Sequence, residues 1–158
     1  MSCLCEISTL CKKSLQRAKL GNSSDAIQDG KDFYKYMFTH YPDLRKYFKG
    51  AEHFSADDVQ KSERFEKQGQ RLLLGCHIMA ETYENPEVFR AYVRETINRH
   101  RQFKMDPSLW LAFFTVFEAY LETKLEMDDE TRKAWATLGK KFNQEAQMHL
   151  RSLGLPSA

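Results

Sequence analysis

The segment FEKQGQRLLLGCH, residues 65–77, decides how this chain folds. Its apolar side chains Phe65, Leu72 and Cys76 are separated by seven and four residues, which places them on one face of an α-helix. Apolar residues continue at the same period beyond the segment in both directions. The spacing therefore predicts a long helix over about residues 62–83.

The rest of the chain repeats this helical spacing. Leu is far more frequent than Val or Ile, and no Asn-Gly or Asp-Gly turn joins two alternating runs, so strands are not expected. The sequence predicts an all-α domain of seven to eight helices over residues 6–151, with short tails at 1–5 and 152–158. We expect the last five residues to be disordered. The other expected helices cover about 7–20, 24–41, 86–100, 107–125 and 129–151, with short helical turns after Pro42 and at Ser55–Asp58.

Composition and charge exclude several classes of protein. The 158 residues are 42% hydrophobic and 29% charged, which is typical of one globular domain. A formal net charge of +2 gives no electrostatic basis for binding nucleic acid or an anionic membrane surface. No apolar run approaches the roughly 18–20 residues of a membrane span. The first residues lack a secretory pattern and the four cysteines are not arranged as a disulfide framework, so we expect a reduced, cytoplasmic protein.

Three polar residues interrupt the apolar helix faces: Tyr34, Gln68 and His100. Each alone has a simple explanation: a core tyrosine whose hydroxyl reaches the surface, a buried amide bonded to backbone, and a core or helix-capping histidine. Burying all three is costly unless they converge on something. Gly30 and Gly69 also lie inside predicted helices, where each costs about 1 kcal/mol relative to Ala. If the two glycines face each other, their helices cross closely, and Tyr34 and Gln68 are held at one site.

Tyr34, Gln68-Gly69 and His100 lie in three segments that resemble the globins, and the nematode globins in particular. The segments are DFYKYMFTHYPDLRKYF (32–48), FEKQGQRLLLGCH (65–77) and YVRETINRHRQF (92–103). In the globin pattern a proline opens the third helix and a phenylalanine follows six residues later, as Pro42 and Phe48 do. Tyr34, eight residues before that proline, matches the distal tyrosine of nematode globins. Gln68-Gly69 matches the distal polar residue and its glycine, and His100 matches the proximal histidine.

The resemblance implies a globin fold around haem b (iron protoporphyrin IX). His100 would ligate the iron, with its other ring nitrogen donating to a backbone carbonyl. Tyr34 and Gln68 would donate hydrogen bonds to bound O2. The resemblance also implies that a set of apolar and basic side chains contacts the haem. The apolar members are Phe38, Phe48, Phe65, Leu72, Val93, Ile97, Phe103 and Met105, and the basic ones, expected near the propionates, are Arg71, Arg99 and Lys104.

The implied function is reversible O2 binding with high affinity, for storage, transport or scavenging, with CO and NO as further ligands. The alternative is redox or sensor activity on the same haem, as a nitric oxide dioxygenase, a peroxidase or an O2 sensor. The fold would use nearly the whole chain, which leaves no room for a flavin reductase or a signalling domain, so we expect a binding protein rather than an enzyme. A haem-free interaction module would leave three buried polar groups without a partner. Globins often pair through the long distal helix and its neighbour, so the resemblance allows a homodimer.

Overall fold

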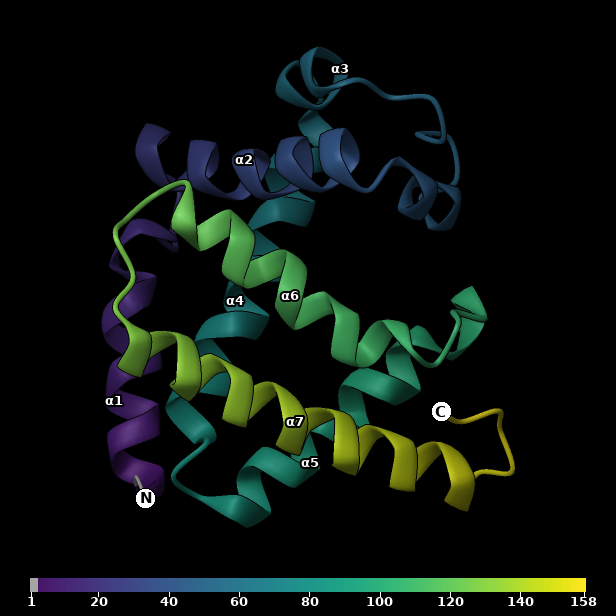
Figure 1. Ribbon diagram of the computed structural model, residues 1–158. Coiled ribbons are helices and arrows are strands. Elements are labelled where there is room, and N and C mark those ends of the chain that lie inside the picture. The colour runs from purple at the N-terminus through teal and green to yellow at the C-terminus, as the bar shows by residue number, and fades with distance from the viewer. Residues whose placement is uncertain (1–2) are drawn as a thin grey trace.

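The computed structural model describes residues 3–158, which form seven α-helices, three short 3₁₀ helices and no strand (Figure 1). The predicted all-α class and the number of helices are confirmed. No helix in the described residues is long and apolar enough to cross a membrane. The helices are α1 (Leu4–Ser14), η1 (Leu15–Arg17), α2 (Ser24–His40), η2 (Pro42–Tyr47), α3 (Ala56–Gln60), α4 (Glu63–Thr82), α5 (Pro86–His100), η3 (Arg101–Phe103), α6 (Leu109–Glu122) and α7 (Asp129–Ser152).

Side-chain caps fix most of the helix starts where the sequence predicts them. Ser23 accepts a hydrogen bond from the backbone of Ala26 at the start of α2, and Asp128 accepts one from Thr131 at the start of α7. Ser55 and Asp58 form a reciprocal capping box at α3. Each cap satisfies a backbone N–H that has no partner within its helix, which is why these polar residues mark helix starts.

Two predicted starts are wrong by a few residues. The first helix begins at Leu4 rather than near residue 7, because the Cys3 thiol caps it by accepting from the Glu6 N–H. Of the predicted 1–5 tail, residues 1–2 lie outside the described residues. α6 begins at Leu109 rather than at 107, because the Asp106 carboxylate accepts from the backbone and hydroxyl of Ser108 and holds a turn before the helix.

The predicted disorder of the last five residues is also wrong. Gly154 adopts a positive φ of 70°, and the chain then turns back from the end of α7. The Leu155 N–H donates to the Leu150 carbonyl at 2.9 Å, and the Ala158 N–H donates to Oε1 of Gln147 at 2.8 Å. The tail is therefore part of the packed structure.

Helix α2 crosses α4 at Gly30 and Gly69, and no other pair of helices shares a larger contact (Figure 1). A Cβ on Gly69 would lie 2.5 Å from the carbonyl carbon of Gly30, and one on Gly30 would lie 2.8 Å from that of Gly69. Backbone cannot yield as a flexible side chain can, so only hydrogen fits at either position. The predicted close crossing is confirmed.

Buried hydrogen bonds connect the other helices around an aromatic core. Trp135 of α7 is fully buried and its indole N–H donates to the Ser14 hydroxyl at 2.8 Å. The Tyr120 hydroxyl of α6 donates to the Asp29 carbonyl of α2 at 2.6 Å. These bonds tie α7 to α1 and α6 to α2.

We predict that Gly69→Ala lowers the free energy of unfolding by about 2 kcal/mol, because the added methyl group meets the Gly30 backbone. Gly75→Ala on the same helix is the control. Its Cβ would meet only the Tyr92 hydroxyl, at 3.0 Å, and that side chain can shift. Urea titration of both variants measures the difference. Equal losses of stability in the two variants would contradict the close crossing.

Candidate functional site

The helix crossing brings four aromatic rings together on one side of the site. Tyr34 and Phe38 come from α2, Phe65 from α4, and Phe48 follows η2. The Tyr34 ring centroid lies 5.1 Å from that of Phe65 and 5.5 Å from that of Phe48. Phe38 lies 5.4 Å from Phe65 and 5.2 Å from Phe48. We call these four residues the distal aromatic cluster. All four were predicted as site residues, and the structure places them in mutual contact.

The Tyr34 hydroxyl lies inside this cluster beside Gln68. Burial raises the pKa of Tyr34 far above its usual value, and the neighbouring polar groups Gln68 and Arg64 only partly offset this. Arg64 Nε lies 3.3 Å from Oε1 of Gln68, which occupies the amide oxygen and leaves the amide N–H groups as donors. At neutral pH the site therefore carries a protonated phenol and an amide N–H, and both are available as hydrogen-bond donors.

His100 is the last residue of α5, and its ring is fixed by its own helix. Nδ1 lies 2.8 Å from the Thr96 carbonyl oxygen, which can only accept, so Nδ1 carries the proton. Burial lowers the pKa of His100 below its usual value, so the neutral ring is favoured. Nε2 therefore keeps a free lone pair, and no side-chain or backbone group of residues 3–158 hydrogen-bonds to it.

His100 lines a cavity of about 350 Å³. The ring is flanked by Trp110 at 5.2 Å and Phe103 at 5.7 Å between centroids. Tyr34 and Gln68 do not line this cavity, so the structure forms a distal cluster and a proximal cavity as two separate groups. The cavity's other lining residues are Ile97, Arg101, Lys104, Met105, Pro107, Trp110, Leu150, Leu155 and Pro156.

The remaining predicted pocket residues differ in exposure. Val93 and Ile97 are fully buried, and Leu72 is half-buried against the core. Phe103, predicted as a pocket wall, leaves 45% of its surface exposed and offers only an edge to His100. Three basic residues were predicted near the propionates: Arg71, Arg99 and Lys104. All three are exposed and form no ion pair within residues 3–158.

Sequence reasoning missed six lining residues of the cavity: Arg101, Pro107, Trp110, Leu150, Leu155 and Pro156. Trp110 and Leu150 continue apolar helix faces, which is a signal for burial but not for a particular cavity. For the tail, Gly154 at the end of α7 was the available signal, because glycine at this place commonly ends a helix and reverses the chain.

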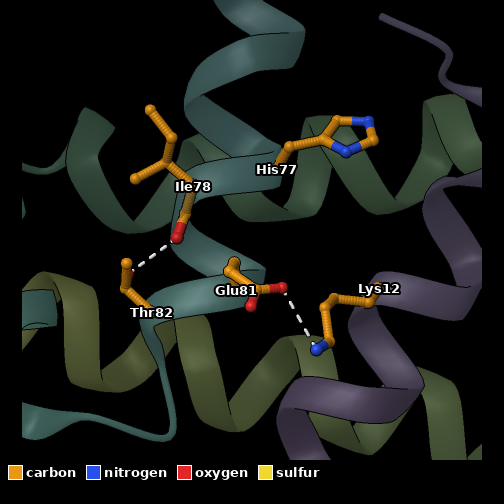
Figure 2. A pocket seen from close by; sticks show the side chains of 5 residues that line it. All are labelled: Lys12, His77, Ile78, Glu81 and Thr82. Carbon is orange, nitrogen blue, oxygen red and sulfur yellow. Dashed lines mark hydrogen bonds and ion pairs between the residues drawn. The ribbon is translucent and has the colours of Figure 1, made fainter.

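A second hollow, of about 400 Å³, lies between α1 and α4 (Figure 2). Figure 2 shows Lys12 and Glu81 facing each other across it, with Nζ 3.1 Å from Oε2. The Thr82 hydroxyl donates to the Ile78 carbonyl, and Nε2 of His77 lies 2.7 Å from the Ala18 carbonyl oxygen. These groups satisfy one another, and no predicted site residue lies here. The contacts of this hollow connect α1 to α4.

The residues present fit a haem. One neutral imidazole offers a free ring nitrogen, and the distal cluster offers two hydrogen-bond donors among aromatic rings. Exposed cations lie near the cavity, where carboxylates of a cofactor would find partners. This donor set, with one nitrogen ligand and apolar walls, is the one that haem iron takes in globins.

Comparison with known proteins gives the family. The globin family profile matches residues 31–146. A globin-like protein of Caenorhabditis elegans is 59% identical over 151 residues, which cover 96% of this chain and 95% of the relative. A myoglobin of Nippostrongylus brasiliensis is 52% identical and covers 97% of this chain and 99% of its own length.

Solved structures agree. A structure of the C. elegans globin-like protein superposes with a TM-score of 0.99 at 56% identity over the full length of both chains. A ferric myoglobin of Aplysia limacina, 16% identical and covering 94% of this chain and 99% of its own, has a TM-score of 0.80 and shares the fold. The chain therefore belongs to the globin family, among the nematode globins that its distal and proximal motifs resemble.

Proposed function

We propose that this globin binds haem b through His100 and reversibly binds O2 with high affinity. The observation that carries the proposal is the fixed tautomer of His100, because its Nδ1–Thr96 hydrogen bond leaves Nε2 free to ligate iron. Two similar proteins carry the name myoglobin, which supports the same function. Bound haem supplies an iron with an open coordination position at which a small gas binds.

On the proximal side, the protein orients one neutral nitrogen. The Thr96 carbonyl fixes the rotation of the ring, and Trp110 and Phe103 make edge-type contacts with it. Because burial keeps the ring neutral, the nitrogen does not have to lose a proton before it binds metal. The buried side chains of Val93 and Ile97 exclude water from the same side.

On the distal side, the protein supplies hydrogen bonds to the gas. The Tyr34 hydroxyl and the Gln68 amide are both donors at neutral pH. At about 1–1.5 kcal/mol each, two such bonds in a dry site increase O2 affinity by roughly 30–150-fold, mainly through slower release. CO is less polar when bound and gains less from the same donors, so O2 is favoured relative to CO.

The exposed cations Arg71, Arg99 and Lys104 are the proposed partners of the haem propionates. None of them forms an ion pair within the described residues, so each is free to bind a carboxylate. Such exposed pairs are worth at most about 1 kcal/mol each, so they orient the haem more than they retain it.

The second candidate function is redox or sensor activity on the same haem, as a nitric oxide dioxygenase, a peroxidase or an O2 sensor. The two distal donors favour it, because slow O2 release suits scavenging or chemistry better than delivery. Turnover of NO by the oxygenated protein with a cellular reductant distinguishes the two functions. Sustained turnover supports the redox role, and a single stoichiometric reaction supports O2 binding.

We predict that His100→Gly removes the spectrum of the haem-bound wild-type protein and that free imidazole restores it, because the ligand then enters the space left by the ring. His53→Gly is the control, since His53 is an exposed loop residue with no contact to the site. Visible absorption with and without imidazole measures the effect. A wild-type spectrum in His100→Gly without imidazole would exclude His100 as the iron ligand.

We also predict that Tyr34→Phe speeds O2 release several-fold, because it removes one of the two donors. Tyr36→Phe on the same helix is the matched control, because the Tyr36 ring packs on His40 away from the distal aromatic cluster. Stopped-flow displacement of O2 by CO measures both rates. An unchanged rate in Tyr34→Phe would rule out the two-donor site.

A further inference from the structure

The end of α7 sends the last residues back across the molecule. Gly154 lies at φ 70°, a region that favours glycine, and its N–H donates to Arg151 while the Leu155 N–H donates to Leu150. This pair of bonds is the usual way in which a glycine ends a helix and reverses the chain. In Figure 1 the yellow tail turns back from α7 toward α6. Leu155 packs against the hydrophobic core.

One buried side chain connects this tail to the segment between α5 and α6. Gln147 of α7 is only 3% exposed. Its Oε1 accepts from the Ala158 N–H at 2.8 Å, and its Nε2 donates to the Pro107 carbonyl at 2.9 Å and to Asn143 Oδ1 at 2.8 Å. The amide is thus satisfied at both ends, and removing it would break the part-buried hydrogen bonds that join α7 to Ala158 and to Pro107.

The two segments joined by Gln147 are walls of the proximal cavity. Leu155 and Pro156 line it from the tail, while Met105 and Pro107 line it from the segment that follows His100. Of these residues only Met105 was a predicted haem contact. Gln147, which does not line the cavity itself, therefore connects its two walls.

We propose that Gln147 and residues 155–158 form a proximal clamp that retains the haem. The clamp holds the segment after His100 in place and closes the cavity to water, which would otherwise hydrate its apolar walls and compete for the histidine nitrogen. This proposal rests on the proposed function, because it takes His100 as the haem ligand. Gln147 acts here as a positioning residue.

The first test is the rate of haem transfer from the ferric protein to an excess of a haem-free acceptor globin. Gln147→Leu and a variant lacking residues 155–158 are expected to release haem about ten-fold faster than the wild type, as the loss of the part-buried hydrogen bonds of Gln147 predicts. Gln144→Leu is the matched control. Gln144 is the same residue type on the same helix, but it is exposed and makes no side-chain hydrogen bond.

The second test is amide hydrogen exchange in the haem-free protein. The amides of residues 104–106 are expected to exchange faster in Gln147→Leu and in the shortened variant than in Gln144→Leu, while α1 keeps its protection. Faster exchange throughout the chain would show general destabilisation and overturn the clamp. Wild-type haem-transfer rates in both clamp variants would overturn it too, but would leave the proposed function intact. If the wild type takes up no haem, the proposed function fails, and so does the clamp's role in retaining haem.

Discussion

The close crossing of α2 over α4 is the contact on which the rest of the site depends. At Gly30 and Gly69 the two backbones approach so closely that a methyl group on either would overlap the other. This approach brings Tyr34, one turn after Gly30, to Gln68, the neighbour of Gly69. A wider crossing would separate the two donors, so they could no longer act on one ligand. Each glycine is unfavourable within its own helix, but only glycine allows the close crossing that brings the two donors together.

The two sides of the site differ in how their side chains are prepared. On the proximal side the tautomer and the charge of a single histidine are fixed, because one carbonyl sets the tautomer of His100 and burial keeps the ring neutral. On the distal side the protein keeps two hydrogen-bond donors, the Tyr34 hydroxyl among aromatic rings and the Gln68 amide N–H beside it. On both sides regular helices position the side chains. Where those helices cross and where they end determines which side chains meet at the site.

Most of the fold followed from local rules, and the errors have physical causes. Helical spacing gave the number and order of the helices, and polar caps such as Ser55 gave most of their starts. The start of the first helix was missed because the cap is the Cys3 thiol, an uncommon capping group. The ordered tail was missed because its bond to Gln147 joins residues whose contact depends on tertiary packing. The expected roles of His100, Tyr34 and Gln68 came from the globin motifs, whereas cavity walls such as Leu155 depend on tertiary packing that those motifs do not describe.

The most direct test of the central claim is the visible absorption spectrum of the protein reconstituted with haem, reduced under nitrogen and then exposed to air. The account predicts a five-coordinate ferrous spectrum that converts to a stable oxygenated one, because Nε2 of His100 is the only protein ligand proposed for the iron. A six-coordinate ferrous spectrum that oxidises rapidly in air would contradict an open, protected distal site. Failure to bind haem at all would contradict the role of His100 itself.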